Sequence, residues 1–241
     1  MSQESRFIIH DSSSEGLKTQ DPSPQPRVLS LESQSSIQHP VATTQHPAVS
    51  GVVLAGGTSK RMGCDKRFLD WRGTSLLELT LARLRPIVRD LIVVTREPEP
   101  LSLSGVRVMT DRYPGMGVLA GVHAGLCEAR YPWAFVVAGD MPLLHRGLLQ
   151  AMAGMVHAEV DVIVPSLRGM IEPLHALYRV DACALAAERA LLAGRRRIAA
   201  FYPEVRVHAM LEKETRRWDP SDESFFNVNT LDDWAVVCKR L

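Results

Sequence analysis

Residues 54–66 combine glycines, a hydroxyl group and cations in an order that suits the binding of a polyphosphate. The segment reads Leu-Ala-Gly-Gly-Thr-Ser-Lys-Arg-Met-Gly-Cys-Asp-Lys and follows an apolar run that predicts a buried strand. Gly56 and Gly57 allow successive backbone N–H groups to approach phosphate oxygens without interference from a Cβ atom. Arg61 and Lys66 supply charge-assisted hydrogen bonds to the same oxygens. The segment therefore predicts a phosphate-binding loop.

An ordinary glycine-rich turn with two exposed cations is the competing interpretation, because a short motif is only a hypothesis without its structural context. The segment is not a P-loop, since the order Gly-x4-Gly-Lys-Ser/Thr is absent. Gly57 and Gly63 lie six positions apart, and Lys66 does not directly follow a glycine. Cys64 is interpreted as a spacer, because no histidine that could activate its thiol lies near it in the sequence.

Asp140 is the second residue with a chemical signature. It lies in the segment 135–142, Phe-Val-Val-Ala-Gly-Asp-Met-Pro, where a carboxylate follows a predicted buried strand. Such a strand would bring Asp140 to the same sheet edge as residues 54–66. Mg²⁺ prefers oxygen ligands and substrate phosphates, so Asp140 is predicted to hold Mg²⁺ against a bound nucleoside triphosphate. The alternative is that Asp140 caps a helix that starts near Pro142.

Residues 115–120 read Gly-Met-Gly-Val-Leu-Ala and match the dinucleotide-binding pattern G-x-G-x-x-A. The match is rejected because residues 111–114 separate these glycines from the preceding strand, and Asp140 is more distant than the pattern requires. Gly117 is instead interpreted as a helix entry that lets a base or ribose approach. Asp111 would accept hydrogen bonds from N1 and N2 of a guanine; the alternative is an ordinary aspartate at the start of a loop.

Predicted strands and helices alternate along the chain from residue 49 onward. Strands are predicted at 49–54, 91–95, 106–109, 135–138, 160–164, 174–178 and 205–208, the sixth of them antiparallel. Helices are predicted at 75–85, 117–130, 148–156, 181–192 and 231–240, with Ser75 and Asp181 as N-caps. This order predicts an α/β fold of three layers, with helices on both faces of a mostly parallel sheet. Ligands in such folds bind beyond the carboxyl ends of the strands.

Composition narrows the class of protein. The chain has 241 residues, a formal net charge of +1 and no apolar run near the roughly 18 residues that span a membrane, so neither nucleic acid nor membrane is an expected partner. Residues 1–47 are rich in Ser, Gln and Pro and are predicted to be a disordered tail without a targeting signal, and residues 48–241 to form the folded domain. Four scattered cysteines predict reduced thiols and a cytoplasmic protein. The histidines at 123, 145, 157, 175 and 208 show no metal-ligand spacing and are interpreted as structural or surface residues.

Six motifs occur in a fixed order along residues 50–240. They are Leu-Ala-Gly-Gly-x-Ser-x-Arg-Met-Gly-x-Asp-Lys at 54–66, Gly-x-Leu-Ala-Gly at 117–121, Asp-Met-Pro at 140–142, Pro-Leu-x-Ala-Leu-Tyr at 173–178, Gly-x-Arg-Arg at 194–197 and Phe-x-Asn-x-Asn-Thr at 225–230. Together they resemble the molybdenum cofactor guanylyltransferase family. The first motif is shared by several nucleotidyltransferases, and its combination with the last three motifs is far more specific. The resemblance implies a Rossmann-like nucleotidyltransferase fold for residues 48–241.

The resemblance implies a reaction in which GMP passes from GTP to the terminal phosphate of molybdenum-bound molybdopterin. Its products would be molybdopterin guanine dinucleotide and pyrophosphate, with Mg²⁺ as the cofactor. The acceptor phosphate is the attacking group, so the protein has to align it with the α-phosphorus and neutralise charge. GTP and molybdenum-molybdopterin are therefore the expected substrates. Molybdopterin-loading enzymes and molybdoenzyme chaperones are the expected protein partners, and a monomer is the expected assembly.

The resemblance also assigns roles to individual residues. The nucleotide would be bound by Leu54, Ala55, Gly56, Gly57, Lys66, Asp111, Gly117 and Asp140, with Leu54 and Asp111 at the guanine. In catalysis, Arg61 would stabilise the departing pyrophosphate, Lys66 the α-phosphate, and Asp140 the Mg²⁺ ion that bridges donor and acceptor oxygens. The acceptor would be bound by Asn227, Asn229, Arg196 and Arg197. Two alternatives stay open: one asparagine completes the metal shell, or the two arginines are an exposed basic start of a helix.

Other activities remain open at this point. The family usually has cysteine where this chain has Gly139, which keeps a cytidylyltransferase acting on the same acceptor under consideration. The related cytidylyltransferases tend to carry Leu-Ala-Ala-Gly, whereas Gly56 gives this chain Leu-Ala-Gly-Gly and favours guanine. A sugar-phosphate nucleotidyltransferase is a further alternative. A nucleotide-binding regulator without catalysis is disfavoured, because a pure binder has little use for both Lys66 and Asp140.

Overall fold

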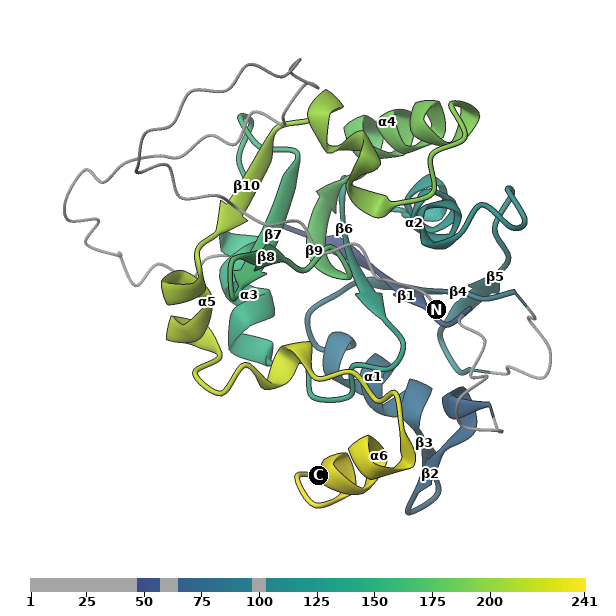
Figure 1. Ribbon diagram of the computed structural model, residues 1–241, viewed down its shortest axis with the longest axis vertical. Helices are drawn as coiled ribbons and strands as arrows, with labels where there is room; N and C mark the ends of the chain where they lie inside the picture. The colour runs from purple at the N-terminus through teal and green to yellow at the C-terminus, as the bar shows by residue number, and fades with distance from the viewer. Residues whose placement is uncertain (1–46, 57–64, 97–102) are drawn as a thin grey trace, which may run out of the picture.

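An eight-stranded sheet forms the centre of the computed structural model, which describes residues 47–56, 65–96 and 103–241 (Figure 1). Its order is β10-β7-β9-β6-β1-β4-β5, and β8 pairs with β7 outside this path. The strands are β1 (Val49–Leu54), β4 (Asp90–Val94), β5 (Arg107–Met109), β6 (Trp133–Ala138), β7 (Val162–Leu167), β8 (Met170–Ile171), β9 (His175–Arg179) and β10 (Val207–Met210). Strand β9 runs antiparallel to both β6 and β7, as predicted, and the pairs β1–β4, β4–β5, β1–β6 and β7–β10 are parallel. The predicted mostly parallel sheet is confirmed.

The connection order reverses at β1, which lies between β4 and β6. From β1 the chain first builds β4 and β5 on one side and then crosses to place β6 on the other. In the β1–β6 register Leu54 is opposite Ala138, so the segments that follow these two strands leave the same sheet edge from adjacent positions. A crevice at such a switch point is the usual ligand site of a doubly wound sheet.

Helices cover both faces of the sheet, which gives the three predicted layers (Figure 1). On one face α1 (Leu76–Leu84) and α3 (Arg146–Gly154) share an apolar cluster with alternate strand residues. On the other face α2 (Val118–Glu128) and α4 (Val180–Leu192) share a second cluster. Neighbouring strand residues divide between the clusters, because successive side chains point to opposite faces.

Two elements explain how closely these layers pack. In β1, Val53 joins the cluster under α1, and Val52 joins the cluster under α2. A Cβ atom at Gly125 would lie 2.2 Å from Cγ1 of Val52. Helix α2 therefore approaches β1 so closely that only glycine is accommodated at this position.

Helix ends test the N-caps predicted from the sequence. Ser75 caps α1 in a capping box with Glu78, as predicted. The N-cap prediction for Asp181 is wrong: Arg179 occupies the N-cap of α4, and the Asp181 carboxylate accepts the N–H of Ala182 within the first turn. An aspartate is also favourable inside the first turn of a helix, so residue type alone does not separate the two positions.

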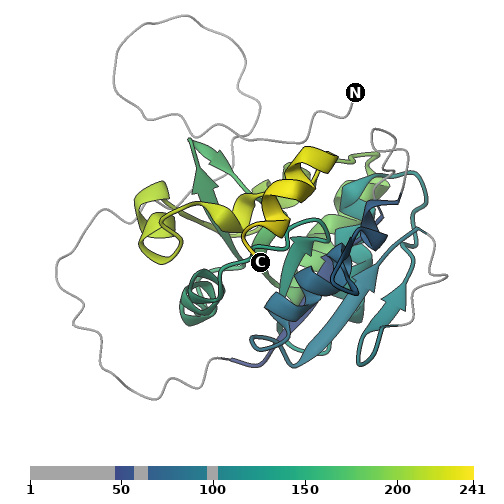
Figure 2. The same cartoon turned by 90° about the horizontal axis from the view of Figure 1, so that it is seen from below.

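Several short elements have no counterpart among the predictions. They are the strand β8, the hairpin β2 (Asp70–Trp71) and β3 (Thr74–Ser75), the 3-10 helices η1 (Lys66–Phe68), η2 (Ile198–Glu204) and η3 (Glu223–Phe225), and the helix α5 (Glu212–Trp218). Helix α5 reads Glu-Lys-Glu-Thr-Arg-Arg-Trp and has no apolar periodicity, and Pro203 lies inside η2. The C-terminal helix α6 (Leu231–Cys238) matches the predicted 231–240 apart from its last turn. Figures 1 and 2 show the yellow C-terminal segment crossing the domain from α5 to α6, which lies near β2 and β3.

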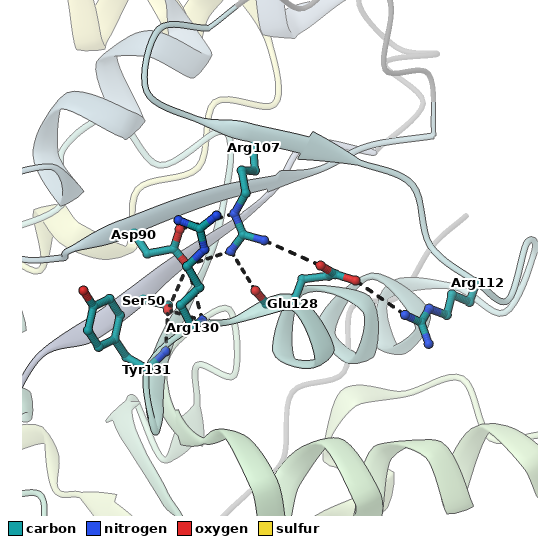
Figure 3. A network of polar contacts seen from close by, with 7 residues as sticks. All are labelled: Ser50, Asp90, Arg107, Arg112, Glu128, Arg130 and Tyr131. Atoms are coloured by element: carbon teal, nitrogen blue, oxygen red, sulfur yellow. Dashed lines mark hydrogen bonds and ion pairs between the residues drawn. The ribbon is translucent and has the colours of Figure 1, made fainter.

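An ionic network closes the amino edge of the sheet, opposite the carboxyl ends of β1 and β6 (Figure 3). Nη2 of Arg107 lies 2.7 Å from Oδ2 of Asp90 and 2.7 Å from the carbonyl oxygen of Glu128. The Ser50 hydroxyl donates to Asp90 and accepts the N–H of Arg130. This network joins β1, β4, β5 and the end of α2.

Within the described ranges, no helix is both long and apolar enough to cross a membrane.

Candidate active site

Lys66, Asp140 and Val228 form a closed set of contacts at the carboxyl edge of the sheet. The Lys66 ammonium group donates to Oδ2 of Asp140, and also to the carbonyl oxygen of Val228 at 3.2 Å. The Val228 N–H donates back to the carbonyl oxygen of Asp140 at 2.9 Å. Three distant parts of the chain, the end of the glycine segment, the end of β6 and the C-terminal segment, therefore meet here. The predicted common edge of Asp140 and the glycine segment is confirmed.

Asp140 lies in a turn, and it does not cap a helix. Helix α3 begins only at Arg146, with His145 as its N-cap, so the alternative in which Asp140 caps a helix near Pro142 is wrong. The turn is anchored by Met141, which is 2% exposed. The Asp140 side chain itself is 17% exposed. The contacts to Lys66 and Val228 give the carboxylate a defined position beyond the end of β6.

Gly139 lies against the end of β1 and helix α1. Its N–H donates to the carbonyl oxygen of Leu54 at 2.9 Å, and its carbonyl oxygen accepts the buried Thr80 hydroxyl at 3.2 Å. A Cβ atom at this position would lie 3.1 Å from the Leu54 carbonyl oxygen and 3.4 Å from Cβ of Ala55. A cysteine here would therefore press on Leu54 and Ala55, two residues predicted to bind the nucleotide. Gly139, which follows β6, places no side chain against these two residues at the end of β1.

A short 3-10 helix, η1, presents Lys66 to this edge. Asp65 is its N-cap and accepts the N–H of Arg67 at 3.0 Å. The Arg67 guanidinium also contacts both carboxylate oxygens of Asp65, and its Nη1 donates to the Thr95 hydroxyl at 2.7 Å. Arg67 and Thr95 were not among the predicted site residues, because no local sequence pattern links residues 28 positions apart.

Gly117 begins α2 with φ of +78°, a left-handed conformation that favours glycine. A Cβ atom on Gly117 would lie 3.5 Å from the carbonyl oxygen of Arg196, so the segment with Arg196 and Arg197 packs beside the α2 N-terminus. Both arginine side chains are exposed, and Arg197 is the N-cap of η2. The two arginines therefore form an exposed basic start of η2, as the alternative describes. Their role in binding the acceptor stays a prediction.

Asp111, Asn227 and Asn229 are the remaining predicted site residues that the structure describes. Asp111 follows β5, and its Oδ1 accepts the N–H of Tyr113 at 3.0 Å, which is the geometry of an ordinary loop-starting aspartate. The Asn227 amide donates to the carbonyl oxygen of Phe225 at 3.4 Å, and Asn229 is exposed. These two asparagines bracket Val228 and so flank the Lys66–Asp140 pair.

Gly56 is the last described residue before a gap at 57–64. A Cβ atom on Gly56 would lie 3.5 Å from the backbone nitrogen of Arg96, so the segment leaves β1 alongside the end of β4. The Ala55 N–H donates to the carbonyl oxygen of Val94 at 2.8 Å and continues the ladder one residue beyond the strand. Gly57 and Arg61, both predicted to bind phosphate, lie outside the described residues.

Comparison with known proteins identifies the family. The family model described as the MobA-like NTP transferase domain matches residues 51–207. The chain belongs to the MobA-like NTP transferase family. A molybdenum cofactor guanylyltransferase of Desulfosudis oleivorans is 34% identical over 187 residues, which are 77% of this chain and 92% of that protein. The crystal structure of molybdopterin-guanine dinucleotide biosynthesis protein A from Archaeoglobus fulgidus is 30% identical, covers 80% of this chain and 100% of that chain, and superposes with a TM-score of 0.68.

The family model spans every predicted site residue except Asn227 and Asn229. Both asparagines lie in the C-terminal segment that Val228 attaches to Asp140. A more distant protein of Mycobacterium tuberculosis, 17% identical with a TM-score of 0.51 over 80% of this chain and 100% of that chain, was crystallised as a complex with manganese. At that identity the likeness shows the fold alone. The nucleotidyltransferase fold and the enzyme class predicted from the sequence are confirmed.

The donor set of this family member fits a weakly held divalent cation. Oδ1 of Asp140 is buried and has no hydrogen-bond partner among the residues that the structure describes. Those residues contain no group of three His, Cys, Asp or Glu side chains arranged as metal ligands. A single carboxylate suits a cation of the Mg²⁺ type, which takes most of its ligands from phosphates and water, and does not suit a structural zinc ion.

His175, in the motif at 173–178, is fully buried at the start of β9. Its ring packs against Phe225 with centroids 4.9 Å apart, and neither ring nitrogen has a hydrogen-bond partner within the described parts of the chain. Burial lowers the pKa of His175 from 6.5 to about 4, and the charge of Asp219 only partly opposes this. The imidazole is thus neutral at physiological pH, and it supports the C-terminal segment by packing. The structural interpretation of this histidine agrees with its surroundings.

Acid should destabilise the protein through His175. The unfolded chain binds a proton at this residue below about pH 6.5, and the folded protein does so only near pH 4, so stability is fully present above 6.5 and falls as the pH drops. The expected loss approaches about 3 kcal/mol by pH 4. Urea unfolding at several pH values will measure it in the wild type and in His175→Gln, whose free energy of unfolding should lack this slope. His157→Gln, at an exposed histidine, is the control. A constant difference between wild type and His175→Gln from pH 7 to 4.5 would contradict the expectation.

Proposed function

We propose that this protein transfers GMP from GTP to the terminal phosphate of molybdenum-bound molybdopterin in the cytoplasm. An oxygen of the acceptor phosphate attacks the α-phosphorus of GTP. The bond from that phosphorus to the oxygen bridging the α- and β-phosphates breaks, and pyrophosphate leaves. The names of the relatives support the reaction, and the observation that supports its location is the contact of Lys66 with Asp140 beyond the carboxyl ends of β1 and β6.

Lys66 is proposed to stabilise the negative charge that develops on the α-phosphate oxygens. Its side chain is only 19% exposed, and a charge in a partly dehydrated site interacts more strongly than one in bulk water. The contact to the Val228 carbonyl oxygen keeps the lysine beside Asp140. The backbone of Ala55 and Gly56, at the end of β1, is proposed to approach the triphosphate.

Asp140 is the residue proposed to hold the divalent cation, Mg²⁺ in our proposal, which when bound neutralises charge on the phosphates. The carboxylate has one oxygen engaged by Lys66 and the other without a partner among the described residues. Asp140 therefore brings an ion-binding oxygen next to the ammonium group that we assign to the α-phosphate. Charge of both signs is arranged within one small site before any substrate arrives.

The outer residues are proposed to orient the two substrates. Gly117 and Leu54 border the β1–α2 side, where Leu54 lies 3.5 Å from the position of a Cβ atom on Gly121, and we assign the guanine to this side with Asp111. Asn227 and Asn229, beside the Lys66–Asp140 pair, are assigned to the acceptor. Arg196 and Arg197, at the α2 N-terminus, are assigned to its pterin side. Gly57 and Arg61 complete the proposed phosphate contacts from outside the described residues.

Pyrophosphate release will test this function. The purified protein is incubated with Mg²⁺ and molybdenum-loaded molybdopterin, with GTP and CTP in parallel. Release with GTP that requires the acceptor would support the proposal. Release with CTP alone would keep the mechanism and assign base selection to the space beside Gly139. No release with either nucleotide, with an acceptor shown to be intact by its use in a known guanylyltransferase, would contradict the proposal.

A further inference from the structure

We propose that Arg67 is a positioning residue for this transfer: its guanidinium ties the turn that carries Lys66 to the ends of β1 and β4. The inference rests on the proposed function, because it concerns the placement of the ammonium group assigned to the α-phosphate. We assign Arg67 no substrate contact of its own, and its effect passes through Asp65 and Thr95, which its guanidinium contacts.

The first part of the tie is within η1. Nε of Arg67 lies 3.0 Å from Oδ1 and 2.8 Å from Oδ2 of Asp65, and the same Oδ1 accepts the backbone N–H of Arg67 at 3.0 Å. Burial of the Asp65 carboxyl acts to raise its pKa, but the hydrogen bonds and charge of Arg67 outweigh this and hold the pKa below 3.8. The carboxylate stays ionised at physiological pH and fixes the turn on both sides of Lys66.

The second part of the tie reaches the sheet. Nη1 of Arg67 donates to the Thr95 hydroxyl at 2.7 Å, and that hydroxyl lies 3.4 Å from the carbonyl oxygen of Ala55. Thr95 is 2% exposed, and its N–H donates to the carbonyl oxygen of Met109, so its backbone is held between β4 and β5. The guanidinium therefore connects Asp65, near the end of the segment 54–66, with Ala55 near its start.

The geometry requires a guanidinium group at residue 67. One edge of the planar guanidinium donates from Nε and Nη2 to the Asp65 carboxylate, while Nη1 donates to the Thr95 hydroxyl. An ammonium group lacks this planar arrangement of donors. The Arg67 side chain is 12% exposed, so these hydrogen bonds compete little with water. Lys66 is the next residue along the chain. A displacement of the turn by about 1 Å at such a site can lower a rate by about a hundredfold.

Arg67→Met tests the proposal, because it keeps the aliphatic stem and removes every donor. We expect kcat for pyrophosphate release to fall by about 10- to 100-fold while KM for GTP changes less than about threefold. The matched control is Arg107→Met, since Arg107 also pairs with a carboxylate, Asp90, but at the opposite sheet edge (Figure 3). Arg107→Met should lower Tm and leave kcat within about twofold of wild type.

Thr95 provides a second and milder pair of variants. Thr95→Val removes the hydroxyl that accepts from Arg67 and should lower kcat about tenfold. Thr95→Ser restores the hydroxyl and should return kcat to near the wild-type value. If Arg67→Met does not fold, the Thr95 pair decides the question. A rise of KM for GTP without a fall of kcat would assign Arg67 to nucleotide binding and overturn the proposal, as would equal rates for Thr95→Val and Thr95→Ser.

Amide hydrogen exchange separates this inference from the proposed function. The N–H groups of Arg67, Phe68 and Leu69 are bonded to Asp65 and Lys66 within η1. In Arg67→Met they should exchange at least about tenfold faster than in wild type, and in Arg107→Met they should not. An inactive wild type would contradict the proposed function, and the exchange rates would still decide whether Arg67 holds the turn. Unchanged exchange would overturn the tie even in an active enzyme.

Discussion

Asp140→Asn will lower kcat for GMP transfer by about 10²- to 10³-fold, the range reported for the loss of one electrostatic group from an active site. The amide has the size of the carboxylate but no charge, so it is a poor ligand for the divalent cation assigned to this position. The exchange also removes the ion pair with Lys66. Pyrophosphate release gives the rate, and electron paramagnetic resonance of Mn²⁺ with GTP present will measure the expected loss of metal affinity.

Asp161→Asn is the control for the removal of a buried negative charge. Asp161 precedes β7 at the amino edge, and its two oxygens accept Nε and Nη2 of Arg206, each at 2.8 Å. This control should lower Tm because the Arg206 guanidinium loses the carboxylate with which it pairs, and kcat should stay within about twofold of wild type. A kcat above about a tenth of the wild-type value in Asp140→Asn, with metal affinity retained, would remove Asp140 from the catalytic assignment.

The parts of the fold that rest on apolar runs were predictable from the sequence. Residues 49–54 and 135–138 are buried strands of a parallel pair, and parallel strands send their carboxyl ends to one edge, so Asp140 and the segment 54–66 had to emerge together. The antiparallel direction of β9 also agrees with the expectation for residues 174–178. In these cases the free energy of burial selects the element, and the residue pattern records that selection directly.

Contacts between side chains far apart in the sequence were not predictable in the same way. The Arg67–Thr95 hydrogen bond depends on where η1 lies relative to the end of β4, and neither residue belongs to a periodic pattern. The backbone bond from Val228 to Asp140 has no residue-type signature, because every residue other than proline carries an N–H group. The asparagines around Val228 were found through the family resemblance, while the reason for their location is this backbone contact.

The exact place of a polar residue at a helix end was the hardest feature to predict, since the same side chain is favourable at several positions there. Asp181 lies in the first turn of α4 and not at its N-cap, and both positions place a carboxylate near a helix N-terminus. Asp140 met the pattern of a cap, but α3 begins six residues later. Whether Asp140 caps a helix or is available as a metal ligand thus depends on where α3 starts. That start depends in turn on the packing of the turn residues after Asp140.

Lys66→Met will have opposite effects on rate and on metal binding, which distinguishes it from a substitution that only disturbs the fold. The kcat for GMP transfer should fall by about 10²- to 10³-fold, because the positive charge that stabilises the α-phosphate is lost. In the protein without nucleotide, the Lys66 ammonium and a divalent cation compete for the same Asp140 carboxylate. Removal of the ammonium should therefore strengthen Mn²⁺ binding about tenfold, which corresponds to about 1.4 kcal/mol.

Calorimetric titration with Mn²⁺ alone, followed by GTP at saturating metal, will separate the two effects. The methionine keeps the length of the side chain, and Lys213→Met on the exposed side of α5 controls for the loss of one positive charge from the whole protein. If the ammonium acts mainly in the transition state, GTP affinity should change far less than kcat. Weaker Mn²⁺ binding in Lys66→Met would mean that the lysine organises the carboxylate as a ligand, so the pair would act as one unit and the two charges would not be competitors. A rate within a few-fold of wild type would transfer the assigned role to Arg61.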